Sequence, residues 1–369
     1  MTASTAASHV DVPKPGAPEV HGGVTSDDAL GCPACHARIE IGASSARCTN
    51  CAASFDVHDG VLCTHRENVF MGEFNASRMM DFVRLAREKG WRRTVRESMA
   101  AENRATETIL MSPQRGSFMP LLMPHATRRV LDVGAGMGAV SMQLSGMFEQ
   151  VYSLDQAFER LAFLQVIADE ERRGGIRTLC HRDVFRLPFQ SGVLDAVVMI
   201  GVFEYFPASY PGMAIEQVQE RALAELYRVL APGGVLFMAT KNRFGWPYWL
   251  GAKDNSGVRF GPPLPRALAD LMSRALLRRP FRVVTDSHRS YDAMLRRAGF
   301  GQPKFYWPIV GYQAPKCWVD LDDERAVRQG IADYPTGTAK RSFFSALAAV
   351  GALKHAVPNF GILARKPPA

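Results

Sequence analysis

The stretch V-L-D-V-G-A-G-M-G-A-V-S, residues Val130 to Ser141, decides the fold of this chain. Apolar residues around a single acid are typical of a buried strand, and the glycines that follow predict a tight turn into a helix. Gly134, Gly136 and Gly138 let the backbone approach a ligand closely, and the first turn of the following helix offers that ligand free amide groups. The stretch therefore predicts a nucleotide-type pocket.

Asp132 separates two cofactor classes that such a turn could serve. Gly134, Gly136 and Ala139 also match the loose dinucleotide pattern G-x-G-x-x-G/A. A carboxylate at the end of the strand, two residues before the first glycine, would repel a pyrophosphate and suits a cationic ligand better. The run resembles the first motif of class I S-adenosylmethionine-dependent methyltransferases, whose ligand carries a sulfonium and an ammonium and no phosphate. An ordinary glycine-rich turn without a ligand is the structural alternative.

The composition predicts a soluble globular protein with one large domain and a small one. The chain has 369 residues, of which 47% are hydrophobic and 22% charged, enough to bury a sizeable core. The formal charge of +8 is compatible with an anionic partner, but the arginines are spread over several segments, which favours a solvated surface. No apolar run approaches the roughly 18 to 20 residues of a membrane span, and the first residues do not resemble a signal peptide. We expect a cytoplasmic protein.

Residues 1–28, rich in Ala, Ser, Thr, Pro and Gly, predict a disordered tail, because they cannot bury enough surface to offset the entropy of ordering. A C-x2-C-x12-C-x2-C array then predicts a closed, structural zinc site in residues 29–65, with reduced thiols as the alternative. Residues 54–61 resemble the strand-turn-strand ending of small zinc ribbons of the tRNA-methyltransferase-activator type. The four predicted zinc ligands are Cys32, Cys35, Cys48 and Cys51.

Residues 66–115 predict a helical linker in front of the nucleotide pocket. From Ser77 to about Ser112, apolar residues recur at helical spacing, with a break near Gly90 and a second helix from Trp91. These basic helices could bind nucleic acid, but amphipathic packing over the ligand pocket explains the same residues more simply. In many methyltransferases such preceding helices cover the bound cofactor.

Residues 116–369 alternate predicted strands with predicted helices, which indicates a doubly wound parallel sheet with its ligand at the carboxyl ends of the strands. Resemblance to the class I methyltransferases implies an α/β, Rossmann-like sheet of seven strands, of which the last, residues 359–366, is antiparallel. After the first strand, the others are predicted at residues 151–155, 177–180, 196–200, 235–240 and 304–312.

Two further carboxylates arrive at predicted strand ends. Asp155 ends the second strand, where a carboxylate can accept both ribose hydroxyl protons, although it could also cap the next helix. The resemblance implies that Asp183 takes the exocyclic amine of the adenine and that Val184 packs on its ring. The predicted cofactor-binding residues are Asp132, Gly134, Ala135, Gly136, Gly138, Asp155, Gln156, Asp183, Val184 and Gly201.

Two segments of the chain are additions to what a minimal methyltransferase contains. Residues 242–286 combine tryptophans, tyrosine and phenylalanine with glycines and prolines, which predicts a long irregular loop, an aromatic lid at the active edge of the sheet. Its aromatic rings would suit stacking on a sugar or another ring-bearing acceptor, and packing for stability is the alternative. Residues 313–358 form an insertion with a helix around residues 342–354, expected either to extend the acceptor site or to form a homodimer contact.

The aromatic run, the zinc ribbon and a helix from Ser287 to Phe300 together resemble bacterial methyltransferases encoded among polysaccharide and secondary-metabolite genes. The resemblance implies S-adenosylmethionine-dependent methyl transfer to a small-molecule or glycan acceptor, with O-methylation expected. A hydroxyl acceptor needs a base, because its proton is held tightly at neutral pH. The candidate bases are His288 first, then Glu204, Asp254 and His181.

Two alternatives remain at this point. Ribosomal RNA guanine methyltransferases also join an amino-terminal zinc ribbon to this fold, so an RNA base is a second acceptor class. The N-P-P-Y-type amine motif is replaced here by Gly201-Val202-Phe203-Glu204, which opposes that hypothesis. The third hypothesis is a non-catalytic partner that docks through its zinc ribbon, and the intact set of acidic and glycine positions opposes it.

Overall fold

The computed structural model describes residues 25–65, 73–123 and 128–369. Most of the expected disordered tail, residues 1–28, lies outside the described residues. Its last four residues do not belong to a tail, because they begin strand β1 (Thr25–Gly31). Asp27 is buried, and its carboxylate accepts a hydrogen bond from the hydroxyl of Tyr152 at 2.8 Å, so this end of the strand is part of the packed structure.

Among the described residues, thirteen strands form one sheet in the order β1-β2-β3-β4-β5-β8-β7-β6-β9-β10-β13-β11-β12. Its middle seven strands, β8 to β11 in that order, are parallel except for β13, which pairs antiparallel with β10 and β11. The predicted doubly wound, seven-stranded class I architecture is confirmed. The remaining strands are β2 Arg38–Ile41, β3 Ser45–Cys48, β4 Ser54–His58, β5 Val61–Cys63, β6 Arg129–Val133, β7 Gln150–Asp155, β8 Ile176–Cys180, β9 Leu194–Ile200, β10 Leu230–Lys241, β11 Lys304–Pro308, β12 Trp318–Asp320 and β13 Asn359–Arg365.

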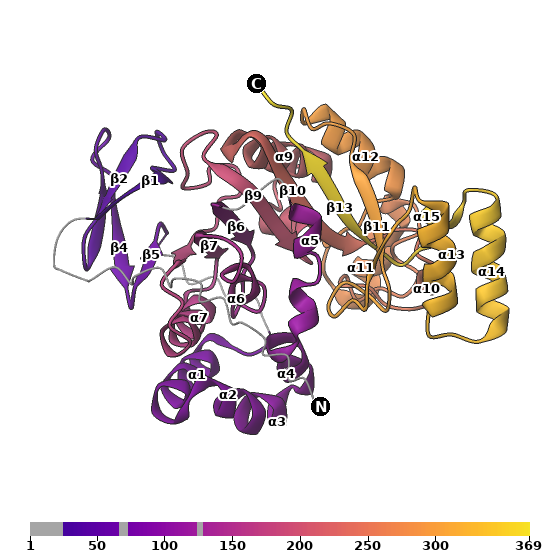
Figure 1. The fold of residues 1–369 in the computed structure, drawn as a ribbon, viewed down its shortest axis with the longest axis horizontal. Coiled ribbons are helices and arrows are strands. Elements are labelled where there is room, and N and C mark those ends of the chain that lie inside the picture. Colours follow the sequence, from indigo (N-terminus) through magenta and orange to yellow (C-terminus); the bar gives the residue numbers. More distant parts are fainter. Residues whose placement is uncertain (1–24, 66–72, 124–127) are drawn as a thin grey trace, which may run out of the picture.

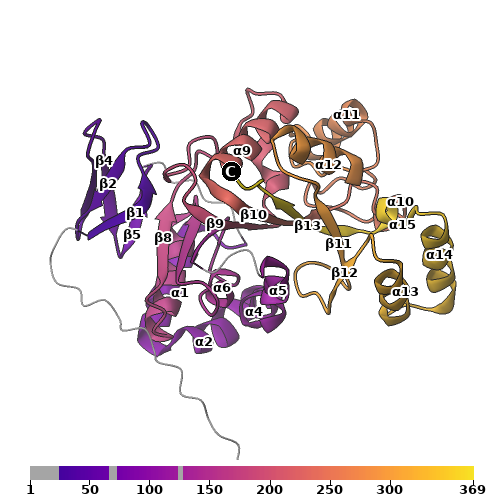
Figure 2. The same ribbon diagram turned by 45° about the horizontal axis from the view of Figure 1, so that its top comes forward.

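Helices cover both faces of the sheet, because alternate residues of each buried strand point to opposite sides. Val130 in β6 packs into the cluster that contains Leu144 of α6, whereas Leu131 packs into the cluster that contains Leu226 of α9. Figure 2 shows α6 on one side of the sheet and α9 with α12 on the other. The helices concerned are α6 Ser141–Leu144, α7 Phe158–Glu170, α9 Ile215–Val229 and α12 His288–Arg297.

The amino-terminal strands β1 to β5 extend the large sheet, although the sequence predicts a separate small ribbon. Strand β5 pairs in parallel with β8, with Leu62 opposite Leu179 and Cys63 opposite Cys180. Arg177 of β8 also forms an ion pair with Asp27, 2.9 Å apart. A sheet edge presents unpaired backbone groups, and β5 satisfies those of β8. The ribbon and the parallel sheet therefore share one hydrogen-bonded framework (Figure 1).

The helices before the glycine stretch pack on the outer side of α7. Phe82 of α1 and Trp91 of α2 share a buried cluster with Phe163 of α7 and Met137 of the glycine-rich turn, which fits the expected packing role. The chain breaks at Gly90 (φ 88°), as predicted. The elements are α1 Ala76–Lys89, α2 Trp91–Thr94, a π-helical turn η1 Val95–Met99, α3 Ala100–Glu102, α4 Arg104–Met111, η2 Pro113–Gly116 and α5 Met119–Leu122.

The late part of the chain holds more regular structure than the sequence predicts. Within the aromatic lid, residues 266–277 form a helix, α11, where an irregular loop was expected. Strand β11 ends at Pro308 instead of residue 312, because Val310 and Gly311 adopt positive φ angles that end the pairing. The insertion folds as β12 and three helices. The helices of these segments are α10 Trp246–Trp249, α11 Arg266–Leu277, α13 Glu324–Asp333, α14 Thr338–Ala349 and α15 Leu353–Ala356.

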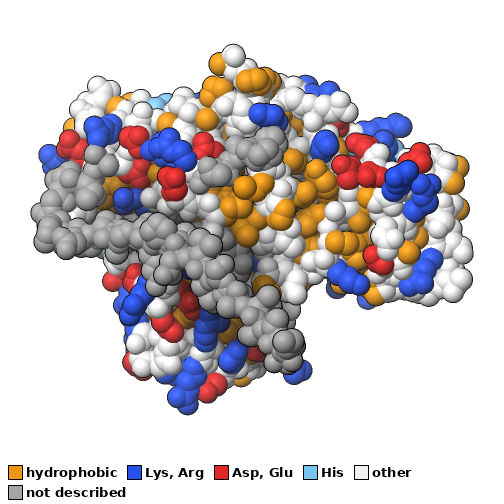
Figure 3. All heavy atoms as spheres, viewed as in Figure 1, with side chains coloured by type: hydrophobic (Ala, Val, Ile, Leu, Met, Phe, Trp, Pro, Cys, Tyr) orange, Lys and Arg blue, Asp and Glu red, His pale blue; other side chains and the backbone are white. Residues whose placement is uncertain are grey.

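The face seen in Figure 3 mixes both signs of charge around an apolar area that lies over α5. Lysine and arginine side chains alternate there with acidic ones, and they do not line up as a basic stripe. A phosphate backbone is normally tracked by such a stripe. In the part of the chain that the structure describes, no helix has the length and apolarity that crossing a bilayer would require.

Candidate functional site

The glycine turn after β6 closes against the neighbouring strand β7. The amides of Gly134 and Ala135 both donate to the carbonyl of Leu154, at 2.7 and 3.0 Å, and the amide of Gly136 donates to the Asp155 carboxylate at 2.9 Å. Gly134, Gly136 and Gly138 have φ angles of 71°, 56° and 88°, which side chains rarely adopt. Glycine is thus required by the backbone here, as well as by the close approach of a ligand.

Gly138 also leaves no room for a side chain. A Cβ atom at this position would lie 2.1 Å from Cδ1 of Leu164 in α7. Because the φ angle is strained for alanine and the core would be overpacked, we expect Gly138→Ala to lower the free energy of unfolding by about 3 kcal/mol. Urea denaturation measures this loss. Gly212→Ala is the control, since a Cβ atom there would meet nothing within 4 Å, and an equal loss in both variants would contradict the interpretation.

Asp132 lies at the carboxyl end of β6, beneath the glycine turn, and is 2% exposed. Its carboxylate accepts a hydrogen bond from the hydroxyl of Ser141 at 2.7 Å, and Ser141 in turn accepts one from Ser153 at 2.8 Å. Burial raises the pKa of Asp132 to about 6, and the bond from Ser141 opposes that rise. The protein thus keeps an anion in a place where water cannot solvate it, which is typical of a site built for a cation.

Asp155 ends β7 directly beside the turn. One carboxylate oxygen accepts from Gly136 and the other accepts from the amide of Ala157, both at 2.9 Å. Each oxygen of a carboxylate can accept a second bond, so the group can still take ribose hydroxyls while it orders the turn. Gln156 follows with its carbonyl accepting a weak bond from the Cys180 thiol. The N-cap of α7 is Ala157, without a side-chain cap, so the alternative that Asp155 caps the next helix is wrong, and its role as ribose ligand stays a prediction.

His181 positions the predicted adenine-binding segment, and neither of its nitrogens is available as a base. Nδ1 contacts the hydroxyl of Thr64 at 2.6 Å, and Nε2 contacts the carbonyl of Asp183 at 2.7 Å. Burial lowers the pKa of His181 to about 4. The carboxylate of Asp183 accepts from the amide of Phe185 and from the hydroxyl of Tyr210, which also accepts from the amide of Val184.

A second polar cluster forms where β9 and β10 end. Glu204 lies in the short helix η3 (Phe203–Tyr205) that precedes α8 (Phe206–Ser209), and it is completely buried. One carboxylate oxygen accepts from Thr240 at 3.2 Å, and the other accepts from the side-chain amide of Asn255 at 3.0 Å. The carbonyl of that amide accepts from the Lys241 ammonium at 2.6 Å. Burial raises the pKa of Glu204 and lowers the pKa of Lys241.

Asp254, from the aromatic lid, joins this cluster. Its Oδ1 accepts from the amide and the hydroxyl of Ser256, whereas its Oδ2 is buried and has no hydrogen-bond partner among the described residues. Burial raises the pKa of Asp254. Its charge and that of Glu204 also raise the pKa of Tyr205, to about 12, after the larger effect of burial. The structure therefore brings two of the candidate bases, Glu204 and Asp254, into one buried group.

His288, the first candidate base, lies elsewhere. Its ring packs against Phe305 of β11, with ring centroids 4.0 Å apart, and against His355 and Phe360 at 5.5 and 6.0 Å. Burial lowers the pKa of His288 to about 4, and the nearby Lys354 contributes. No contact described in the structure links it with Glu204 or Asp254. Its surroundings are those of an aromatic packing residue at the start of α12.

Two residues of the site were missed by sequence reasoning. Burial lowers the pKa of Arg115, in η2, and the nearby charge of Asp132 opposes that fall. Tyr312, in the loop after β11, is 5% exposed, and its hydroxyl would lie 3.1 Å from a Cβ atom on Gly201. Burial and then the charge of Glu204 raise its pKa. Neither residue stands in a recognisable motif, so the sequence carried no signal for them.

The four predicted zinc ligands converge. Their sulfur atoms all lie within 4.8 Å of one another, with Cys32 3.6 Å from Cys51 and Cys35 3.5 Å from Cys48. A tetrahedral zinc site with bonds of about 2.3 Å places sulfurs roughly 3.8 Å apart. The amides of Asn50 and Cys51 point at the Cys48 sulfur, as they do toward a thiolate that holds a metal. The donor set and its spacing fit zinc.

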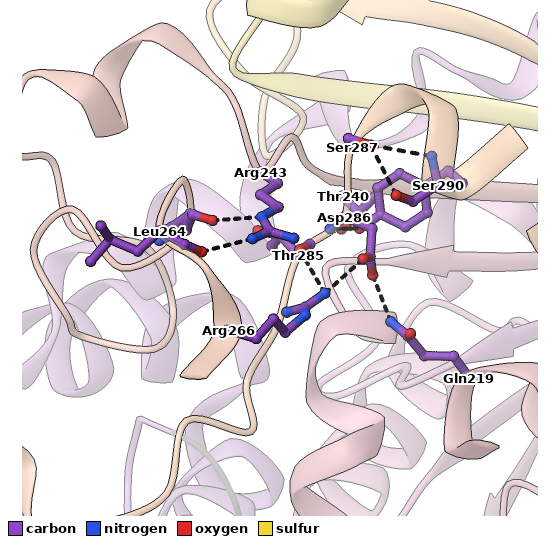
Figure 4. Close-up of polar contacts among 11 residues, drawn as sticks. Gln219, Thr240, Arg243, Leu264, Arg266, Thr285, Asp286, Ser287 and Ser290 are labelled. Carbon is purple, nitrogen blue, oxygen red and sulfur yellow. Dashed lines mark hydrogen bonds and ion pairs between the residues drawn. The ribbon is translucent and has the colours of Figure 1, made fainter. Parts of the chain in front are cut away.

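The aromatic lid is fastened to the fold by a buried carboxylate, Asp286 (Figure 4). Its Oδ1 accepts from Arg266 at the start of α11, and its Oδ2 accepts from Gln219 of α9, both at 2.7 Å. Arg243 donates to the backbone carbonyls of Pro262 and Leu264, which holds the middle of the lid. The lid is thus a fixed part of the structure that carries Asp254 and Asn255 into the site.

Comparison with known proteins agrees with this geometry. Residues 131–238, which run from β6 to β10, match the family described as a methyltransferase domain. Residues 131–238 therefore form a methyltransferase domain. The match covers the glycine turn and the ends of β7, β8 and β9, where the predicted cofactor-binding residues lie.

Three curated relatives show how widely this methyltransferase domain is shared. The demethylmenaquinone methyltransferase of Thermus thermophilus is 35% identical over 141 residues, which cover 36% of this chain and 59% of that protein. The ubiquinone/menaquinone biosynthesis C-methyltransferase of Dinoroseobacter shibae is 26% identical, over 52% of this chain and 73% of the relative. The malonyl-[acyl-carrier protein] O-methyltransferase of Pectobacterium atrosepticum is 32% identical, over 34% of this chain and 44% of that protein. The chain thus spans from 44% to 73% of the length of these relatives.

Proposed function

We propose that this protein transfers a methyl group from S-adenosylmethionine to a small-molecule or glycan acceptor. The observation that carries the proposal is the presence of opposite charges beside the glycine turn, on the buried Asp132 and on Arg115, whose Nε atom is buried. The amino-acid end of S-adenosylmethionine carries an ammonium and a carboxylate. The Asp132 carboxylate has the opposite charge to the ammonium, and the Arg115 guanidinium has the opposite charge to the carboxylate. When bound, the cofactor supplies an electrophilic methyl group.

The residues present fit this cofactor. Nε of Arg115 is buried and has no hydrogen-bond partner among the described residues, so a donor is available for a carboxylate. Asp132 would hold the ammonium, Asp155 the ribose hydroxyls, and Asp183 with Val184 the adenine. A buried cation and a buried anion are each costly alone, and a zwitterionic ligand neutralises both. Calorimetric titration with S-adenosylmethionine tests this part directly, and absence of binding would refute it.

The buried cluster at the ends of β9 and β10 serves the acceptor. An acceptor hydroxyl must lose its proton as the methyl group is transferred, and Oδ2 of Asp254 is the one carboxylate oxygen of Asp254 and Glu204 that no described residue occupies. Glu204 and Lys241 hold Asn255, and with it the loop that carries Asp254. We assign Asp254 as the base and Glu204 as a positioning residue. O-methylation follows from this assignment, and the names of the relatives, which include both C- and O-methyltransferases, support methyl transfer without selecting the atom.

We expect Asp254→Asn to lower kcat on a hydroxyl acceptor by about a hundredfold to ten-thousandfold. In the unsubstituted protein, kcat/KM should fall as the pH drops through a pKa that burial has raised above the usual aspartate value, and the variant should lose this limb of the profile. The acceptor for the assay comes from a screen of radiolabelled S-adenosylmethionine against sugar nucleotides, glycan intermediates and RNA. Unchanged turnover in the variant would remove Asp254 as the base.

Asp292→Asn is the matched control for this substitution, since Asp292 lies on α12, away from the buried cluster, and pairs with Arg296. Cofactor binding should be the same in both variants, so that a loss of turnover in Asp254→Asn reports on the acceptor side. Transfer to RNA in the same screen, with a steep dependence on salt, would instead favour a nucleic acid acceptor.

We further propose that the four cysteines hold a structural zinc ion. All four positions of a tetrahedral ion would be filled by sulfur, which leaves none for a substrate. The strands that carry the cysteines continue into β5 and β8, so the metal would stabilise the edge of the sheet beside the adenine segment.

A further inference from the structure

Helix α11 in the aromatic lid exposes its large apolar residues and buries its small ones. Leu268, Leu271 and Leu276 are 50%, 65% and 67% exposed, whereas Ala269 and Ser273 are buried. An amphipathic helix on a globular protein normally turns its leucines to the core. Figure 2 shows α11 at the outer edge of the molecule, above the sheet. Its leucines therefore face outward from the folded chain.

Other apolar side chains of the lid lie along the same segment. Trp249 and Leu250 are 59% and 74% exposed, and Phe260, which contacts Gly251, is 47% exposed. Leu277 at the end of α11 lies beside Gly257, so the loop of residues 250–260 joins these aromatic residues to the helix. We call this set the α11 surface. It consists of Trp249, Leu250, Phe260, Leu268, Leu271, Leu276 and Leu277.

Positive charge predominates in the segment that carries the α11 surface. Residues 242–286 contain eight basic residues and three acidic ones. Two of the acids, Asp254 and Asp286, are buried, and Asp270 is engaged by Arg274. Apart from this ion pair, the exposed charged positions beside the apolar residues are basic, namely Lys253, Arg259, Arg278 and Arg279. The local surface is therefore apolar and cationic, in contrast to the mixed charge seen in Figure 3.

The structure holds α11 in this orientation at both ends. Arg266 in its first turn is bound to the buried Asp286 (Figure 4), and Arg279 just past its end donates to the carbonyl of Ser256 at 3.0 Å. Ser273 on the inner side donates to the carbonyl of Arg279 at 2.8 Å. Rotation of the helix to bury its leucines would break these bonds. The outward orientation of the apolar side chains is therefore fixed by the fold.

We propose that the α11 surface docks on a lipid bilayer that contains anionic headgroups. Leucine and tryptophan side chains enter the boundary between headgroups and acyl chains, while flanking arginines and lysines bind the anionic headgroups. A second copy of the chain fits less well, because the exposed charges beside this surface that lack an acidic partner on it are basic and would meet basic residues of the other copy. Charge complementarity thus selects a negatively charged partner with an apolar interior, which a bilayer provides.

Docking here would place the acceptor site at the membrane. Asp254 and Asn255 belong to the loop of residues 250–260 that borders the α11 surface, and they reach the buried Glu204. The acceptor would then be carried on a lipid of that bilayer, an extension that rests on the proposed methyl transfer. Docking itself does not depend on that activity.

Flotation of the full-length protein with vesicles tests the proposal. We expect binding to vesicles of equimolar phosphatidylglycerol and phosphatidylcholine, and binding about tenfold weaker or more to phosphatidylcholine alone. The variant Leu268→Ser with Leu271→Ser and Leu276→Ser should lose binding to the anionic vesicles by about tenfold or more. The matched control carries Phe343→Ser and Val350→Ser, in and just after α14, where the native side chains are 50% and 76% exposed, and should bind as the unsubstituted protein does.

A charge variant, Lys253→Gln with Arg259→Gln and Arg278→Gln, should weaken vesicle binding by a similar factor, and it keeps the test valid if the leucine variant fails to fold. Equal vesicle binding by the leucine variant and the unsubstituted protein would overturn the proposal. So would a dimer, seen by light scattering, that the leucine variant dissociates while vesicles do not bind. Calorimetry with S-adenosylmethionine is run in parallel, so that vesicle binding without cofactor binding would refute the proposed function alone.

Discussion

Replacement of Asp132 by Asn should weaken cofactor binding by about a hundredfold and, at the same time, make the cofactor-free protein more stable at neutral pH. The carboxylate is the buried anion proposed to hold the ammonium of S-adenosylmethionine, and a charged hydrogen bond of this kind contributes about 3 kcal/mol, which corresponds to a loss of affinity of about a hundredfold. Calorimetric titration measures that loss. Asn keeps the shape and can still accept the hydrogen bond from Ser141.

The gain in stability follows from the raised pKa of Asp132. A carboxyl whose pKa rises to about 6 on folding contributes stability that is fully present below its unfolded pKa and is lost as the pH rises through 6. The neutral Asn side chain does not suffer this loss. The free energy of unfolding of Asp132→Asn should therefore be higher than that of the unsubstituted protein by up to about 3 kcal/mol at pH 8, and equal to it at pH 4. Urea denaturation at the two pH values gives the difference.

Asp195→Asn is the control at the other end of the same region. The Asp195 carboxylate accepts hydrogen bonds from the amides of Arg128 and Arg129, where β6 begins. The substitution should lower the free energy of unfolding without changing the affinity for the cofactor. If Asp132→Asn bound S-adenosylmethionine normally, the charge-pairing basis of the proposed function would be lost.

Replacement of Cys48 by Ser should have the largest effect on stability. The proposed zinc ion would lose one of four thiolates, and structural zinc sites contribute apparent binding free energies on the order of 10 kcal/mol to folding. We expect about one zinc per chain in the purified protein and less than about a tenth of that in the variant, measured by mass spectrometry of the metal. Strands β1 to β5 should then lose their protection from proteolysis, and thermal unfolding should begin at a lower temperature.

Cys317→Ser serves as the control for this substitution, because Cys317 is a free thiol far along the chain, outside the four-sulfur cluster. It should keep a full complement of zinc and the original unfolding temperature. A metal-free protein that unfolds no earlier than the zinc-loaded one would show that the four cysteines do not hold a structural ion.

The central sheet was predictable because its strands and turns carry local signals. Val130 to Ser141 predicts a strand, a turn with positive φ angles and a helix, and each of these requirements is visible in the residue types alone. The order of Asp132, Asp155 and Asp183 along the chain follows from strands that alternate with helices. The cysteine spacing likewise predicted the convergence of four sulfur atoms that the structure shows.

The rest of the site was not predictable in the same way, since it is assembled by tertiary contacts. Arg115 and Tyr312 stand far apart in the sequence, in a 3-10 turn and a loop, and only the fold brings them to Asp132 and Gly201. His288 was favoured because histidine titrates near neutral pH, yet an aromatic cluster surrounds it. Helix α11 was missed because the glycines and prolines of residues 242–286 indicated a loop, although residues 266–277 have the apolar spacing of a helix.

The pairing of β5 with β8 sets a limit on how this protein can be divided. A shortened chain that starts after residue 65 would leave the backbone groups of β8 exposed along an apolar edge, with Leu179 and Cys180 beside them. Such edges pair readily with one another, so the remaining domain would be prone to self-association and aggregation. The amino-terminal strands are therefore better regarded as the closing edge of the catalytic sheet than as a detachable accessory.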